Sequence, residues 1–232
     1  MITLSVSAAN AATNGLGSLA GTGGSSNALQ ILLLIGGLSL IPAILFTVTG
    51  FTRILIVLGF IRTAMGTNTT PPNQVLVGIA LFLTLFVMHP TITQIEHKAY
   101  QPLVHHQITT VQAIHRGEEP LREFMFNQVK AKDLSLFVDL AHVKVPRTRA
   151  QVPTYVLIPA FIMSELKSAF SIGFLIFLPF LIIDLIVSST LMSVGMMMLP
   201  PTFISLPFKI LLFVLVDGWD LITHSLVQSF HT

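Results

Sequence analysis

The chain has 232 residues, of which 53% are hydrophobic and only 9% are charged, with a formal net charge of +2. Soluble domains carry roughly 25% charged residues, so this composition excludes an ordinary soluble protein and indicates a membrane-class chain. The small excess of positive charge gives no argument for nucleic-acid binding, and the absence of cysteine excludes disulfides and thiolate metal sites.

The charged residues are unevenly placed. None occurs from Met1 to Thr52, and 14 of the 22 lie between Glu96 and Arg149. This pattern predicts four parts: a flexible Gly-, Ser- and Ala-rich leader (1–27), N-terminal hydrophobic helices (28–90), a polar helical insertion (91–152) and C-terminal hydrophobic helices (153–232). The leader lacks the basic start and the apolar run of a signal peptide.

In the N-terminal part, Ala28 to Phe51 is long enough to cross a bilayer, which takes about 20 apolar residues, with a kink expected at Pro42. The segment Thr67 to Gln74 is predicted to be a turn. The next apolar run, Val75 to Met88, has 14 residues and ends at His89 and Pro90. A helix of about 21 Å falls short of a hydrocarbon core about 30 Å thick, so we expect it to pack on other protein rather than to span.

The polar insertion shows an amphipathic helical pattern. Its apolar positions are Leu121, Met125, Val129, Leu134, Phe137 and Ala141. Three histidines in this part, His105, His106 and His115, have no cysteine or carboxylate at ligand spacing. We interpret them as exposed polar residues rather than as metal ligands.

In the C-terminal part the apolar pattern is broken by charges, first at Glu165 and Lys167, then at Asp184 and Lys209. An ionised group in a lipid-facing helix costs at least about 2.5 to 3.5 kcal/mol, so such groups normally face protein or water. One interpretation is that Glu165 and Lys167 mark a turn between two short helices. The other is that partner subunits cover the hydrophobic helices and that buried ion pairs fix how they fit.

Three consecutive methionines, Met196, Met197 and Met198, lie between Gly195 and Pro200. A helix cannot continue past the proline pair that follows them. Methionine is flexible and polarizable, and it fills irregular gaps. The segment is therefore either ordinary core filler or a deformable constriction.

Four ordered blocks of the sequence resemble the FliP family, whose members are flagellar proteins and their counterparts in virulence injectisomes. The resemblance covers about Leu38 to Val227. The blocks are PAFIMSELKSAFSIGF (159–174), PFKILLFVLVDGW (207–219), TGFTRILIVLGFIRTAMG (49–66) with PPNQVLVGIALFLT (71–84), and GMMMLPP (195–201).

This resemblance implies an export-gate subunit of a type III secretion apparatus, not an enzyme, and no cofactor. Roughly five copies are expected to wind with Q-type and R-type subunits into a closed helical cone that conducts unfolded proteins. Further export-apparatus membrane proteins and the basal-body ring would surround the cone. Its place would be the bacterial inner membrane, within lipid, with the polar insertion and much of the assembly on the periplasmic side.

The resemblance also implies roles for particular residues. Met196, Met197 and Met198 match a pore-closing methionine gasket, and Glu165 and Lys209 match an ion pair between subunits. We expect buried polar groups in the same packing core at Asp184, Arg53 and Arg62.

Alternatives from other classes are weaker. The segment Pro120 to Phe137 looks more like flagellar members than like injectisome members, which would otherwise play the same role. A small-solute transporter would show related repeats in its two halves, and none is found. An intramembrane hydrolase would need a base for Ser164, but no histidine and no GxSxG motif accompanies it.

The predicted fold is all-α, with kinked hairpins of hydrophobic helices and a small amphipathic helical domain inserted between them.

Overall fold

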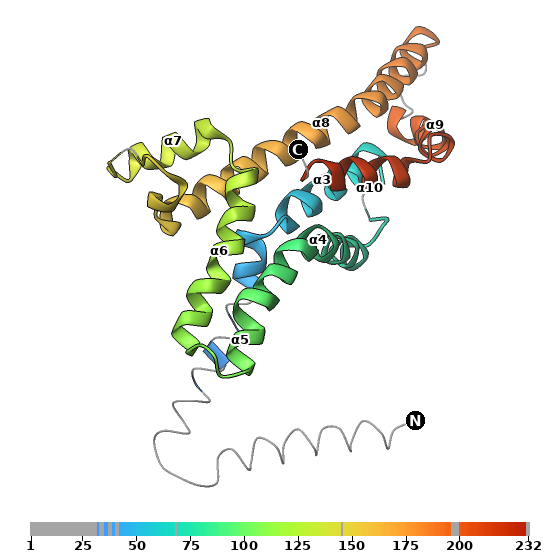
Figure 1. Cartoon of the computed structure of the whole chain (residues 1–232). Helices are drawn as coiled ribbons and strands as arrows, with labels where there is room; N and C mark the ends of the chain where they lie inside the picture. The colour runs from blue at the N-terminus through green and yellow to red at the C-terminus, as the bar shows by residue number, and fades with distance from the viewer. Residues whose placement is uncertain are drawn as a thin grey trace, which may run out of the picture. The chain divides into compact units, whose positions relative to one another are not determined.

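The computed structural model describes residues 32, 35–36, 39, 42–67, 69–144, 146–195 and 200–230. Within these ranges every regular element is helical and no strand occurs, which confirms the all-α fold class (Figure 1). The predicted leader (1–27) and Met196, Met197 and Met198 lie outside the described residues. The architecture below concerns the compact unit Phe46–Thr232.

Figure 1 labels the α-helices, and two short helical turns, η1 and η2, lie between them along the chain. The elements in chain order are α3 (Phe51–Ala64), α4 (Asn73–Ile95), the π-helical turn η1 (Glu96–Tyr100), α5 (Gln101–Val104), α6 (Thr110–Gln128), α7 (Ala131–Leu140), the 3₁₀ turn η2 (Arg149–Gln151), α8 (Thr154–Ser193), α9 (Pro201–Leu215) and α10 (Gly218–Gln228).

By length and composition, two helices among the described residues can cross a membrane, Asn73–Val104 and Thr154–Ser193. The number rises to four if each of two bent helix pairs is one span. One pair is Pro42–Val48 with α3, and the other is α9 with α10, which meet at a bend of 64°. The hydrophobic helices expected from the composition are therefore present.

Helix α4 does not end at Pro90, so the expectation of a 14-residue helix was wrong. The helix has 23 residues, about 35 Å at about 1.5 Å per residue, and η1 and α5 extend the helical backbone to Val104. Proline removes one helical hydrogen bond, but Val87, Met88 and Thr91 are buried on both sides of Pro90. Packing on α6 and α3 holds the helix together across it, and the length argument against a span no longer applies.

Helix α8 is continuous over 40 residues and carries Glu165, Lys167 and Asp184 inside it. The interpretation that Glu165 and Lys167 mark a turn was wrong. Each of these three charges has an oppositely charged partner in the same chain, so the helix does not have to break to hydrate them. At about 1.5 Å per residue α8 is about 60 Å long.

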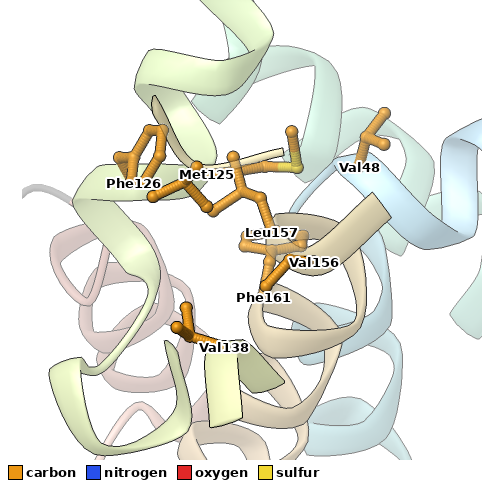
Figure 2. Close-up of a cluster of buried hydrophobic side chains, with 8 residues drawn as sticks. Val48, Met125, Phe126, Val138, Val156, Leu157 and Phe161 are labelled. Atoms are coloured by element: carbon orange, nitrogen blue, oxygen red, sulfur yellow. The ribbon is translucent and has the colours of Figure 1, made fainter. Parts of the chain in front are cut away.

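The polar insertion packs on the first turns of α8 through a hydrophobic cluster (Figure 2). Buried members are Val48, Met125, Phe126, Val138, Val152, Val156, Leu157 and Phe161. The predicted apolar positions of the insertion contribute to this cluster, but they come from two helices, because the chain is extended at Val129 and Lys130 between α6 and α7. Helix α6 begins with a capping box, in which the side chains of Thr109 and Gln112 each bond the other's backbone N–H.

Candidate functional site

The methionine segment joins α8 to α9, and the structure describes the residues on both sides of it. Helix α8 ends at Ser193, and Gly195 has a φ of +79°, a left-handed conformation that suits glycine. Pro200 is the N-cap of α9, and Pro201 is its first residue. Helix α8 therefore ends before the methionines, and a separate helix begins at Pro201.

Arg53 on α3 and Glu165 on α8 form a buried ion pair. Nε of Arg53 donates to Oε2 of Glu165 at 2.9 Å, and Nη2 donates to Oε1. The side chains are only 3% and 1% exposed. This two-bond geometry is the strongest form of a carboxylate–guanidinium contact, and it fixes α3 against the N-terminal third of α8. Arg53 is thus a buried charged group in the folded chain.

Asp184 on α8 and Lys209 on α9 form a second pair. Nζ of Lys209 donates to Oδ2 of Asp184 at 2.6 Å, and Oγ of Ser205 donates to Oδ1 at 2.6 Å. The Lys209 side chain is 5% exposed and that of Asp184 is 26% exposed. Asp184 therefore belongs to the polar packing between α8 and α9, on the two helices that flank the methionine segment.

The structure does not bring Glu165 and Lys209 together within one chain, since each is paired with another residue. Their pairing between neighbouring copies stays a prediction. Arg62 is half-buried rather than buried, and its Nη1 donates to the side chain of Asn73 and to the carbonyl of Pro71. It links the end of α3 to the start of α4.

A third cluster, around Asp133, was missed by the sequence analysis. Asp133 is 2% exposed and accepts a hydrogen bond at 2.8 Å from Ser164 and another from Lys167, both on α8. The Ser164 hydroxyl also accepts the backbone N–H of Lys130 at 3.0 Å. A signal was present: Asp133 is four residues before Phe137 and so shares the apolar face of its helix.

The Asp133 carboxyl has a pKa below its ordinary value. Burial acts to raise this pKa, but it is outweighed by the hydrogen bonds from Lys167 and Ser164 and by the positive charges of Lys167 and Lys130. The ionised form is therefore stabilised in the folded chain. The cluster ties α7 to α8 most strongly when Asp133 is charged.

We expect Asp133→Asn to destabilise the protein by an amount that depends on pH. Because the folded pKa is lowered, the contribution of the carboxylate is fully present above the pKa of the unfolded chain, about 3.9. It is lost as pH falls through the folded pKa. The melting temperature of wild type minus that of the variant, measured in detergent, should be constant above pH 5 and shrink below about pH 4.

The matched control for this experiment is Asp139→Asn, since Asp139 is exposed on the same helix. It should leave the melting temperature close to wild type throughout. An undiminished difference between wild type and Asp133→Asn well below the ordinary pKa would contradict the assigned role of the carboxylate.

Within the described part of the chain, no group of three or more histidine, aspartate or glutamate side chains is placed to hold a metal ion. The buried charges instead pair with one another, and they join α3, α7 and α9 to the long apolar helix α8. Long apolar helices with internally paired charges define a helical integral-membrane class of protein.

The family is shown by comparison with known proteins. The FliP family profile matches residues 34–226, and the chain belongs to this family. The flagellar biosynthetic protein FliP of Bacillus subtilis (strain 168) is 54% identical over 205 residues, covering 88% of this chain and 93% of that protein. The protein of the same name from Pectobacterium carotovorum subsp. carotovorum is 54% identical over 204 residues, covering 88% and 79%. That from Caulobacter vibrioides is 50% identical over 210 residues, covering 90% and 79%.

Proposed function

We propose that this protein is a core subunit of the flagellar type III protein export gate and forms part of the channel through which unfolded flagellar proteins leave the cell. The observation that carries this proposal is the 54% identity, over 88% of the chain, to a flagellar biosynthetic protein. The relatives reported above are all named as flagellar, which favours the flagellar role over the same role in a virulence injectisome.

Large exposed apolar side chains support an assembled state. Phe82 and Phe86 on α4 are 76% and 67% exposed, and Phe203 on α9 is 76% exposed. A groove of about 440 Å³ between α8 and α9 is lined mostly by apolar side chains. Apolar surfaces of this extent mark contacts with protein or lipid. Further exposed residues on α8 are Phe170, Phe174, Leu175, Ile182, Leu185 and Ile186.

The assembly we propose has roughly five copies of the chain, wound with Q-type and R-type subunits into a closed helical cone. Helix α8, at about 60 Å, is about twice as long as the hydrocarbon core is thick, which supports a cone that rises out of the bilayer. The proposed location is the flagellar basal body in the inner membrane, among further export-apparatus membrane proteins and inside the basal-body ring. Residues 91–152 would face the periplasm.

In the closed gate, we assign Met196, Met197 and Met198 of several copies to an interdigitating gasket. An apolar constriction excludes hydrated ions because removing their water is costly. A passing chain displaces the side chains, and methionine, with no fixed shape or charge, accommodates many sequences without binding any of them strongly. In the sequence the methionines lie between α8 and α9, and the Asp184–Lys209 pair fixes these two helices relative to each other.

The hydrogen bonds of Ser164 support a structural rather than a catalytic role for this residue. Its hydroxyl donates to Asp133 and accepts from the backbone N–H of Lys130, so it is used to hold α7. No histidine accompanies it in these bonds.

The experiment that tests the gate replaces Met196, Met197 and Met198 together by alanine. We expect the constriction to widen, so that small ions leak while export and assembly continue. The measurement is membrane conductance in cells that carry the complete gate, together with motility as the readout of export.

Met192→Ala is the matched control, because Met192 is an exposed methionine on the last turn of α8. It should not raise the conductance. Unchanged conductance in the triple variant would reject the gasket and would leave these methionines as core filler.

A further inference from the structure

Phe230, two residues after α10, packs against the start of α3. The Phe230 side chain is 7% exposed. Its ring lies so close to Gly50 that a Cβ placed there would be 2.6 Å from it, a distance that real side chains do not tolerate. The ring also stacks on Phe124 of α6, with 6.4 Å between centroids.

Arg53 also contacts Ser229 and Phe230, through the side of its guanidinium that does not face Glu165. Nη1 donates to the carbonyl and the hydroxyl oxygen of Ser229, at 2.7 and 3.1 Å. The guanidinium carbon lies 4.0 Å from the centroid of the Phe230 ring, in cation–π geometry. Arg53 therefore binds Glu165 of α8 and the residues that follow α10 at the same time.

Gln128, the last residue of α6, completes the enclosure. Its Oε1 accepts from Nη2 of Arg53 at 3.0 Å, and its Nε2 donates to the carbonyl of Phe230 at 2.9 Å. Three helices, α3, α6 and α8, and the two residues that follow α10 thus meet at one buried guanidinium. Arg53 makes five hydrogen bonds, one for each N–H donor of its guanidinium.

Helix α10 needs such a tether. It has 11 residues, and isolated helices shorter than about 12 to 15 residues are marginal. It follows α9 after a bend of 64° and starts from Asp217, whose φ of +48° is unusual for a residue other than glycine. Leu221, on its outer face, is 59% exposed. Local sequence preference alone does not fix where this helix lies.

We infer that Gly50, Arg53, Gln128, Ser229 and Phe230 form a C-terminal clasp that locks α10 onto α3. The clasp requires Ser229 and Phe230, and it fixes the C-terminal side of the α9–α10 pair, while the Asp184–Lys209 pair fixes α9 against α8.

The first test uses the natural absence of cysteine. In the full-length chain, Gly50→Cys with Phe230→Cys should be joined in most molecules by a short bifunctional thiol reagent in detergent, because the far edge of the Phe230 ring reaches the Cβ position of residue 50 and the reagent spans the space that the ring leaves. Gly59→Cys with Phe230→Cys is the matched control. Gly59 lies inside α3, more than two turns from Gly50, and has no atom within 4 Å of its Cβ position, so it should not crosslink. Crosslinking of both pairs or of neither would overturn the clasp.

The second test is a cycle of stability measurements. Phe230→Ala should lower the melting temperature in detergent by about 10 °C, as expected for loss of a buried phenylalanine. Arg53→Lys keeps the charge but loses the fork of donors. If the clasp exists, Arg53→Lys and removal of residues 229–232 should together cost less than the sum of their separate shifts, since both remove the same contacts. Additive shifts would contradict it.

Discussion

Replacing Arg53 by methionine is expected to destabilise the folded chain by about 3 to 5 kcal/mol, because it leaves the buried Glu165 carboxylate without its counter-ion. For a protein of this length that corresponds to a fall in melting temperature of about 10 °C. The measurement is thermal unfolding of the purified chain in detergent, with the yield of membrane-inserted protein as a second readout. We expect motility to be lost, since too little folded subunit would remain to assemble.

The double change, Arg53→Met with Glu165→Leu, should recover part of the loss, since it removes the uncompensated charge. Recovery is partial because the contacts of Arg53 with Ser229 and Phe230 remain absent. Lys98→Met is the control: Lys98 and Glu119 are 44% and 69% exposed, and exposed pairs contribute about 0 to 1 kcal/mol. If the double variant were less stable than both single variants, the two residues would not act as a pair.

The fold class and the hydrophobic helices could be predicted because they follow from composition and from the uneven placement of charge. The extents of α4 and α8 could not. Pro90 in α4, and Glu165 and Lys167 in α8, are residues that normally break or expose a helix. Here Val87, Met88 and Thr91 are buried around Pro90. Arg53 neutralises Glu165, and Asp133 neutralises Lys167. Such compensation lies in tertiary contacts, which local sequence preference does not contain.

The pairing of the buried charges could not be predicted from the sequence either. Arg53 and Glu165 are 112 residues apart in the sequence, so no spacing connects them. Asp184 was expected to be a buried polar group, and Lys209 was expected to pair with Glu165 of a neighbouring copy. Which charges pair within the chain depends on how α9 folds back on α8. Residue type indicates only that such charges face protein or water, and the structure supplies the partners of Arg53, Asp184 and Lys209 within the chain.

Lys209 has an observed partner within the chain, Asp184, and a predicted partner on a neighbouring copy, Glu165. Variants built on Lys209→Met distinguish these two pairings. Losing this cation leaves an uncompensated, partly buried carboxylate, so we expect the purified hetero-oligomer to be lost. The question is which second change restores it. Asp184→Asn removes the charge on the partner within the chain but keeps an acceptor for Ser205. Glu165→Leu removes the predicted partner on the neighbouring copy.

If the pair within the chain dominates, Lys209→Met with Asp184→Asn should regain stability in the isolated chain and oligomer on size-exclusion chromatography. Glu165→Leu should then make Lys209→Met worse, because it leaves the buried Arg53 unpaired as well. If the contact between copies dominates, Glu165→Leu should restore the oligomer and Asp184→Asn should not. Lys167→Met is the control cation, since its side chain is 48% exposed. Rescue by neither second change would mean that Lys209 serves the fold through its packing rather than through its charge.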